Sequence, residues 1–293
     1  MPIEGAVLDH VAVAVERWSD GWHRYVTELG GRWGSGGTNV GFAPAQLSYG
    51  NGARLELLQP WQSEANPFLR RFIDANGPGP HHLTFKVPDI RSALEVVAAA
   101  GLTPASVDLS DPDWKEAFLH PRQAAGTVVQ LAQAAGSWES QPPEGFPETG
   151  GSPADLVRVT HTVADMDVAL TLFAEILGGA LEPDQGASGP GWRAATVSWA
   201  GPLRLRLVAP ERGGLASASL RPWLGGRPGR VHHLAFHMAA QPQRSTAPTE
   251  AVPGVFPPDH LVEVVEPQDN HGTRLVLLAA AAASASGAFE AAR

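Results

Sequence analysis

The sequence predicts an α+β protein that arose by tandem duplication, with two β-α-β-β-β modules in each half. Two observations predict this fold class. Short apolar motifs recur in the same order in both halves, and strand-like segments alternate with a few amphipathic helices. The recurring pairs are His81–Phe85 and His232–Phe236, Leu55–Pro60 and Leu205–Pro210, Leu29–Gly31 and Leu177–Gly179, and Gly126-Thr127 and Gly272-Thr273. The offset between partners stays between 146 and 151 residues, which indicates that a whole set of elements was copied.

The first module begins with alternating apolar residues, which predict a strand over Val7–Val15. A helix is expected over Ser19–Leu29, where apolar residues share one face and Gly30 follows as a C-terminal cap. Strands are then expected near Val40–Phe42, Gln46–Tyr49 and Ala53–Leu58.

The second module repeats this order. We expect a strand at His82–Val87, a helix at Asp89–Ala100 with Asp89 as its N-cap, and strands near Ala117–His120 and Thr127–Ala132. The second half starts again with a strand at Val157–Val163 and a helix at Asp165–Leu177. Between Met238 and Val255 a stretch rich in proline and polar residues replaces the last helix.

The duplication predicts two domains. Residues 1–134 form the first and 156–283 the second, with a tail at 284–293. Residues 135–155 are rich in Gly, Pro, Ser and Glu without apolar periodicity, so they are expected to be a linker.

Composition narrows the possible functions. The formal net charge is −9, which argues against nucleic acid or an anionic membrane as the main partner. The absence of cysteine excludes disulfides, thiolate nucleophiles and cysteine-ligated metals, so any metal must be held by nitrogen and oxygen ligands. Met1–Leu8 has no basic segment before an apolar one, and the apolar run Leu275–Ala283 is too short to span a bilayer, so a cytoplasmic protein is expected.

The first half resembles the vicinal oxygen chelate superfamily, which includes glyoxalase I, bleomycin resistance proteins and extradiol dioxygenases. The residues that carry the resemblance are Leu8–Val15, Leu55–Pro60, Asn66–Val87, and His120-Pro121 through Gln130-Leu131. Asn66–Val87 is most similar to the methylmalonyl-CoA epimerase and glyoxalase-like branch. The resemblance implies curved mixed sheets with helices outside, a small-molecule substrate, and a monomer or homodimer.

The resemblance also implies one divalent metal ion, held by His10, Glu56, His82 and Gln130. Two imidazoles, a carboxylate and an amide oxygen suit Mn, Fe, Co, Ni or Zn. Glu56 stands between leucines, where a buried carboxylate is costly unless it is paired or bound to a metal. An isolated histidine in a strand is more often structural than a ligand, but four matching positions favour a metal site.

The same positions in the second half are Arg158, Arg206, His233 and Val276. Three of these cannot be ordinary metal ligands, so the second domain is expected to be a degenerate copy without metal. It is either structural, or Arg158 and Arg206 bind a carboxylate or phosphate of a substrate.

The resemblance favours isomerisation, epimerisation or lyase chemistry through a metal-stabilised enolate, with Glu56 as the catalytic base. Gln130 stands where epimerases and glyoxalases of this superfamily carry a carboxylate, which indicates a divergent activity. Two alternatives remain open: a ligand-binding or resistance protein, for which Trp18, Trp22, Trp33 and Trp61 offer stacking surface, and a dioxygen-using oxygenase. Pairing of the first module with the fourth would bring together His10, Glu56 and His233, a triad typical of such oxygenases, but pairing within each half is preferred.

Overall fold

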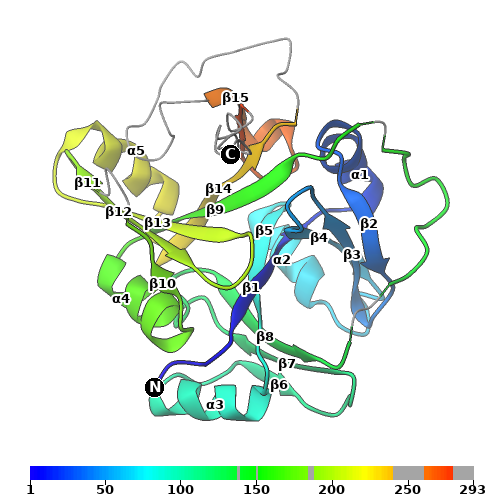
Figure 1. Ribbon diagram of the computed structural model, residues 1–293, viewed down its shortest axis with the longest axis horizontal. Helices are drawn as coiled ribbons and strands as arrows, with labels where there is room; N and C mark the ends of the chain where they lie inside the picture. The colour runs from blue at the N-terminus through cyan, green and yellow to red at the C-terminus, as the bar shows by residue number, and fades with distance from the viewer. Residues whose placement is uncertain (137–138, 150, 184–187, 240–260, 280–293) are drawn as a thin grey trace, which may run out of the picture.

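The computed structural model describes residues 1–136, 139–149, 151–183, 188–239 and 261–279. The chain forms two mixed sheets, one from each half of the sequence (Figure 1). This confirms the predicted α+β class and the pairing of modules within each half. The Pro-rich stretch expected between Met238 and Val255 lies mostly outside the described residues, as do residues 280–283 and the tail at 284–293.

The first sheet has the strand order β2-β3-β4-β1-β5-β8-β7-β6. Its two modules join where β1 pairs with β5 in an antiparallel manner, and β1 pairs with β4 in parallel on its other side. The strands are β1 Val7–Ala14, β2 Arg32–Gly36, β3 Gly41–Ser48, β4 Arg54–Trp61, β5 Gly79–Lys86, β6 Ser106–Asp108, β7 Trp114–Leu119 and β8 Val128–Ala134.

The second sheet repeats this plan, with the order β10-β12-β13-β9-β14-β16-β15 and β11 paired to β12. Here β9 pairs with β14 antiparallel and with β13 in parallel. The strands are β9 Asp155–Val163, β10 Ala180–Leu181, β11 Ser188–Gly189, β12 Trp192–Ser198, β13 Arg204–Pro210, β14 Gly229–His237, β15 Leu261–Val265 and β16 Leu275–Leu278.

Each expected helix is present. The Asp89 side chain caps α3 (Ile90–Ala99), and the Asp165 side chain caps α4 (Met166–Leu170). In the first and third modules the helix continues as a π-helical turn. These pairs are α1 Trp18–Trp22 with η1 His23–Glu28, and α4 with η2 Thr171–Ile176. The remaining helices are α2 Phe68–Asn76, α5 Gly214–Leu224 and the 3-10 turn η3 Pro267–Asp269.

One prediction for the first module was wrong in detail. The segments expected as two strands near Val40–Phe42 and Gln46–Tyr49 form the single strand β3, which runs through Pro44. The Pro44 carbonyl accepts from the Gly37 backbone, so this side of Pro44 faces β2. The pairing of β2 with β3 ends at Gly36 and Ala45, next to Pro44. The N–H that Pro44 lacks is therefore not needed for a hydrogen bond between these strands.

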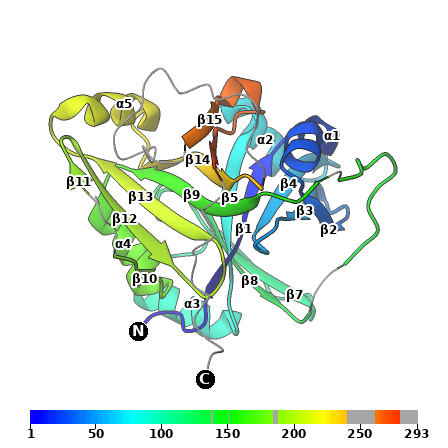
Figure 2. The same cartoon turned by 45° about the horizontal axis from the view of Figure 1, so that its top comes forward.

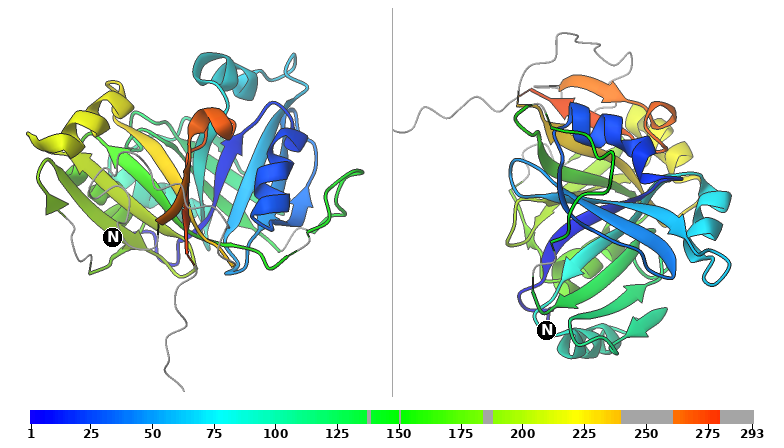
Figure 3. Two further views of the ribbon diagram at one scale, coloured as in Figure 1. Left: turned by 90° about the horizontal axis from the view of Figure 1, so that it is seen from above. Right: turned by 90° about the vertical axis from the view of Figure 1, so that its right-hand side faces the viewer.

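A single apolar core joins the two sheets, which lie side by side and curve away from each other (Figure 3). Phe85 on β5 contacts Trp199 of the second half, with ring centroids 5.0 Å apart, and Tyr49 contacts Phe236 at the same distance. Helices α3 and α4 contribute Ile90 and Met166 to this core. Helices α2 and α5 pack on the other faces of their sheets (Figure 2). The face of each sheet that is turned away from the shared core therefore carries a helix and a smaller apolar cluster.

The segment between the sheets covers aromatic surface of the first half. Phe146 packs edge-on against Trp22 and Trp33, and Ser140 accepts the indole N–H of Trp33 at 2.9 Å. Trp22 and Trp33 therefore contact the connecting segment itself, whereas Trp61 is 42% exposed.

Backbone contacts between the halves are closest at glycines in repeated positions. A Cβ on Gly126 would meet the Gly229 backbone at 2.0 Å, and a Cβ on Gly272 would meet the Pro78 carbonyl at 1.8 Å. Gly126 and Gly272 have positive φ as well. Beside the first contact, buried His161 donates Nε2–H to the Ala125 carbonyl at 2.7 Å, and burial lowers the His161 pKa to about 4. The glycines of the repeated Gly-Thr pairs thus allow the backbones of the two halves to approach closely.

Gly126→Ala should destabilise the protein by about 3 kcal/mol, because its methyl group would push the halves apart at a residue with positive φ. Urea unfolding measures the change. Gly37→Ala is the matched control, since nothing lies within 4 Å of its Cβ position. Equal stabilities for the two variants would show that the glycine contact does not hold the halves together.

Candidate metal centre

Three predicted ligands converge on the face of the first sheet that is turned away from the core. Ala12 on β1 stands opposite Glu56 on β4 and opposite His82 on β5. Glu56 and His82 therefore lie on either side of β1 at the level of Ala12. His10 precedes Ala12 by two residues and shares its face. The small side chain of Ala12 leaves room between the donors.

The donor atoms are close enough to share one ion. One atom from each of His10, Glu56 and His82 lies within 4.8 Å of the others. Nε2 of His10 is 3.6 Å from Oε2 of Glu56, and Nε2 of His82 is 3.8 Å from the same oxygen. Ligand bonds to a transition metal are about 2.1 Å long, which places neighbouring donors about 3–4 Å apart.

The chemistry of these atoms also fits a metal. Both imidazole Nε2 atoms are buried and have no hydrogen-bond partner among the described residues. Buried polar atoms are normally satisfied, so two that converge on one carboxylate are suited to sharing a cation with it. The residues present therefore fit the divalent metal that the resemblance implies.

Asp9, a residue that the sequence analysis did not select, fixes the orientation of His10. Nδ1 of His10 donates to Oδ2 of Asp9 at 2.8 Å, which leaves the Nε2 lone pair for a ligand bond. Arg54 and Lys86 lie 3.2 and 3.5 Å from Oδ1 of Asp9. Burial alone would raise the pKa of Asp9, but the hydrogen bond and these cations outweigh it and lower the pKa to about 2.

The two imidazoles differ in protonation when no metal is present. Burial lowers the pKa of His82 well below 6.5, so its ring is neutral at neutral pH. Burial acts in the same direction on His10, but the nearby negative charge of Glu56 and the hydrogen bond to Asp9 outweigh it and raise the His10 pKa to about 9. A metal ion must displace this proton before it can bind to His10.

Gln130 lies beside the three donors, but its amide is already engaged. Oε1 accepts from Thr84 at 2.6 Å, and Nε2 donates to Glu116 at 2.7 Å. Oε1 keeps a second lone pair, so its assignment as a fourth ligand stays a prediction. Glu116 also accepts from the Trp114 indole at 2.8 Å. Burial raises the pKa of Glu116, although the hydrogen bonds from Trp114 and Gln130 act to lower it. Glu116 cannot be recognised from the sequence, because its partner Gln130 lies on a neighbouring strand.

Residues 9–118 match the model of the Glyoxalase/Bleomycin resistance protein/Dioxygenase superfamily. This stretch belongs to that superfamily. The superfamily predicted from the sequence is thus confirmed for most of the first half.

Known structures extend the comparison. A triple mutant of 4-hydroxymandelate synthase from Streptomyces coelicolor is 16% identical over 79% of this chain and 71% of its own, with a TM-score of 0.57. This likeness shows a shared fold across both sheets. Methylmalonyl-CoA epimerase from Mycobacterium tuberculosis is 24% identical over 44% of this chain and 89% of its own (TM-score 0.40). A hypothetical protein from Bacillus halodurans C-125 is 26% identical over 47% and 100% (TM-score 0.42). The search of curated proteins found no match to this chain.

Among the described residues, no helix is long and apolar enough to cross a membrane.

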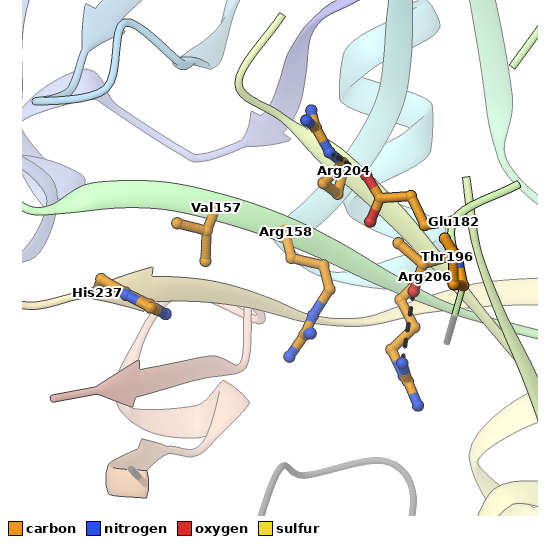
Figure 4. Close-up of a pocket in the computed structure, with 8 residues that line it drawn as sticks. Val157, Arg158, Glu182, Thr196, Arg204, Arg206 and His237 are labelled. Atoms are coloured by element: carbon orange, nitrogen blue, oxygen red, sulfur yellow. Dashed lines mark hydrogen bonds and ion pairs between the residues drawn. The ribbon is translucent and has the colours of Figure 1, made fainter. Parts of the chain in front are cut away.

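The half outside the superfamily match carries different chemistry at the equivalent positions. Arg158 on β9 and Arg206 on β13 line a cavity of about 330 Å³, into which both guanidinium groups extend (Figure 4). Thr196 accepts from Arg206 at 3.4 Å, and Glu182 accepts from Arg204 at 2.6 Å. His233 is fully buried, and burial, His232 and the nearby arginines lower its pKa well below 6.5. Substrate binding by Arg158 and Arg206 stays a prediction, in a cavity on a different sheet from the superfamily site.

Asp9→Asn should weaken metal binding by about 10- to 100-fold, because His10 loses the anionic partner that orients its ring. Competition with a chromophoric chelator for Co²⁺ or Zn²⁺ measures the affinity. Asp74→Asn is the control, since Asp74 pairs with Arg70 on the exposed side of α2. An unchanged affinity in Asp9→Asn would mean that Asp9 does not support a ligand.

Proposed function

We propose that this protein is a divalent-metal-dependent enzyme of the glyoxalase and epimerase type, acting on a small oxygenated substrate. One observation carries the proposal: two buried imidazoles without hydrogen-bond partners among the described residues converge on one carboxylate. His10, Glu56 and His82 would hold the ion, with Gln130 beside them. When bound, such an ion acts as a Lewis acid that polarises a substrate carbonyl.

In this proposal Glu56 moves the proton. Its Oε2 faces the two imidazoles, and its Oε1 accepts from Gln46 at 3.4 Å. Oε1 is thus the oxygen that can take a proton from the carbon next to the polarised carbonyl. Gln46 orients this carboxylate, and Glu116 is a second buried carboxylate held on the adjoining strand by Trp114 and Gln130.

A dioxygen-using oxygenase is the second candidate, and one observation favours it. The sequence analysis expected a triad of two histidines and one carboxylate only from pairing of the first and fourth modules. In the structure His10, Glu56 and His82 form such a set within the first half, whereas His233 belongs to the other sheet. This donor set is typical of non-haem iron oxygenases.

His82→Ala should remove the metal, because it deletes a donor that lies on one side of Glu56. Wild-type protein purified without a histidine tag should contain about one transition-metal ion per chain by elemental analysis, and the variant should contain little. The matched control is His233→Ala, which alters the equivalent histidine of the second half and should retain the metal. Circular dichroism checks the fold of both. Full metal content in His82→Ala would contradict the ligand assignment.

The two candidate reactions are separated by exchange and oxygen measurements on the metal-containing protein. With a panel of epimerisable acids and dicarbonyl compounds in D₂O, we expect deuterium to enter the carbon next to the carbonyl without oxygen consumption. Glu56→Gln should abolish the exchange, because an amide cannot act as a base. Oxygen uptake coupled to substrate loss would instead support the oxygenase. Neither signal with any of these compounds would count against both reactions and favour a binding protein.

A further inference from the structure

A second cavity lies between the halves, away from the Arg158 cavity and next to the metal centre. It has a volume of about 280 Å³ and is lined by the starts of β5 and β14, the C-terminal ends of α2 and α5, and the turns before β8 and β16. Its lining includes Arg122, Arg227, Arg230 and Arg274, and contains no Asp or Glu among the described residues. In a protein of net charge −9, four arginines around one cavity form a local positive site.

These arginines are only partly neutralised by their neighbours. Glu266 accepts from Nε and Nη2 of Arg274 at 3.0 and 2.8 Å. Among the described residues, no ion pair involves Arg122, Arg227 or Arg230. Arg227 donates to Asn76 at 3.3 Å, and Arg230 donates to the Trp223 carbonyl at 3.4 Å, both long hydrogen bonds to neutral acceptors. Burial and the charges of Arg227 and Arg274 lower the pKa of Arg230, the sign expected of crowded like charges.

Trp223 holds two of the arginines in place. The guanidinium carbon of Arg230 lies 4.1 Å from the centre of the Trp223 ring, and that of Arg274 lies 4.5 Å from it. His232 packs on the same ring, and its Nε2 accepts from Nη1 of Arg274 at 2.9 Å. Guanidinium groups fixed in advance lose little freedom when they bind an anion.

The positive charge is not inherited from the duplication. The strand registers make Gly79 the counterpart of Arg230 and Val128 the counterpart of Arg274. The 151-residue offset makes Asn76 the counterpart of Arg227, and these two residues touch across the boundary between the halves. The first half thus has uncharged residues at all three positions, and the second half has arginine at each. Mutual repulsion between these arginines is a cost that a bound anion would remove.

We propose that this cavity binds a small molecule that carries a phosphate or pyrophosphate group, with Arg227 and Arg230 as its main ligands. A phosphate group carries about two negative charges and several acceptor oxygens, which matches paired guanidinium forks. The volume is near the lower end for small-molecule sites, so the ligand is a small one. The cavity borders the proposed metal centre at His81, whose Nδ1 lies 2.8 Å from Nδ1 of His82, and at Val128, which pairs with His82. None of the proposed metal ligands lines the cavity, so the anion site is distinct from the proposed catalytic site.

Inorganic pyrophosphate is the probe, titrated into the purified full-length protein by calorimetry at constant ionic strength. We expect saturable binding at one site, weakened about tenfold or more in Arg230→Gln and in Arg227→Gln. Arg227 is exposed, so Arg227→Gln keeps the test valid if Arg230→Gln does not fold. Arg91→Gln, on the exposed side of α3, is the charge-matched control and should bind as the wild type does.

His82→Ala separates this site from the metal centre, because pyrophosphate also binds metal ions. Retained binding in His82→Ala supports the cavity, and lost binding places the anion at the metal and overturns the proposal. Absence of saturable binding in the wild type would overturn it as well, as would equal weakening in Arg91→Gln. A protein without metal that still binds pyrophosphate would contradict the proposed function and leave the anion site intact.

Discussion

The antiparallel pairing of β1 with β5 is the constraint on which the candidate metal centre depends. It joins the two modules at the middle of the first sheet, and its register sets His82 level with Ala12. The parallel pairing of β1 with β4 sets Glu56 at that same level on the other side. A shift of one residue in either pairing would turn a donor towards the apolar core, where neither a carboxylate nor a metal could be accommodated. The apolar faces that hold the register therefore also assemble the polar cluster.

The second half has the same strand register, but positively charged side chains occupy the positions of the candidate metal ligands. Thr160 stands where Ala12 stands in the first half, and it lies opposite Arg206 and opposite His233. The two arginines at these positions repel a cation, whereas two imidazoles and a carboxylate attract one. A few substitutions on the same strand pairing thus separate a candidate cation site from a cavity lined by arginines. The fold fixes where a ligand binds, and the side chains decide its charge.

Repeats and alternation in the sequence were sufficient to predict the two sheets and the capped helices, because these depend on local patterns that occur twice. Pairing within halves was only the preferred arrangement, because the sequence also allowed the first module to pair with the fourth. Helices α2 and α5 were not predicted, because the expected β-α-β-β-β plan has no helix between modules, although α2 is amphipathic. Strand β2 was not predicted because Arg32–Gly36 is rich in glycine. His10, Glu56 and His82 could be selected through the resemblance. Glu116 could not, because its hydrogen bond to Gln130 depends on the pairing of β7 with β8. Asp9 precedes His10 in the sequence, but only the side-chain geometry shows that it accepts from Nδ1.

The cleft between the halves shows why duplication within one chain matters physically. In a dimer of identical subunits, each arginine on one side of the cleft would be repeated on the other. Here the counterpart of Arg230 is Gly79, which has a φ of +145° and whose Cβ would meet the Gly272 carbonyl at 3.0 Å. An arginine at that position would break the close contact that holds the halves together. Only a chain whose two copies can change independently can keep glycine on one side for packing and place arginine on the other for charge.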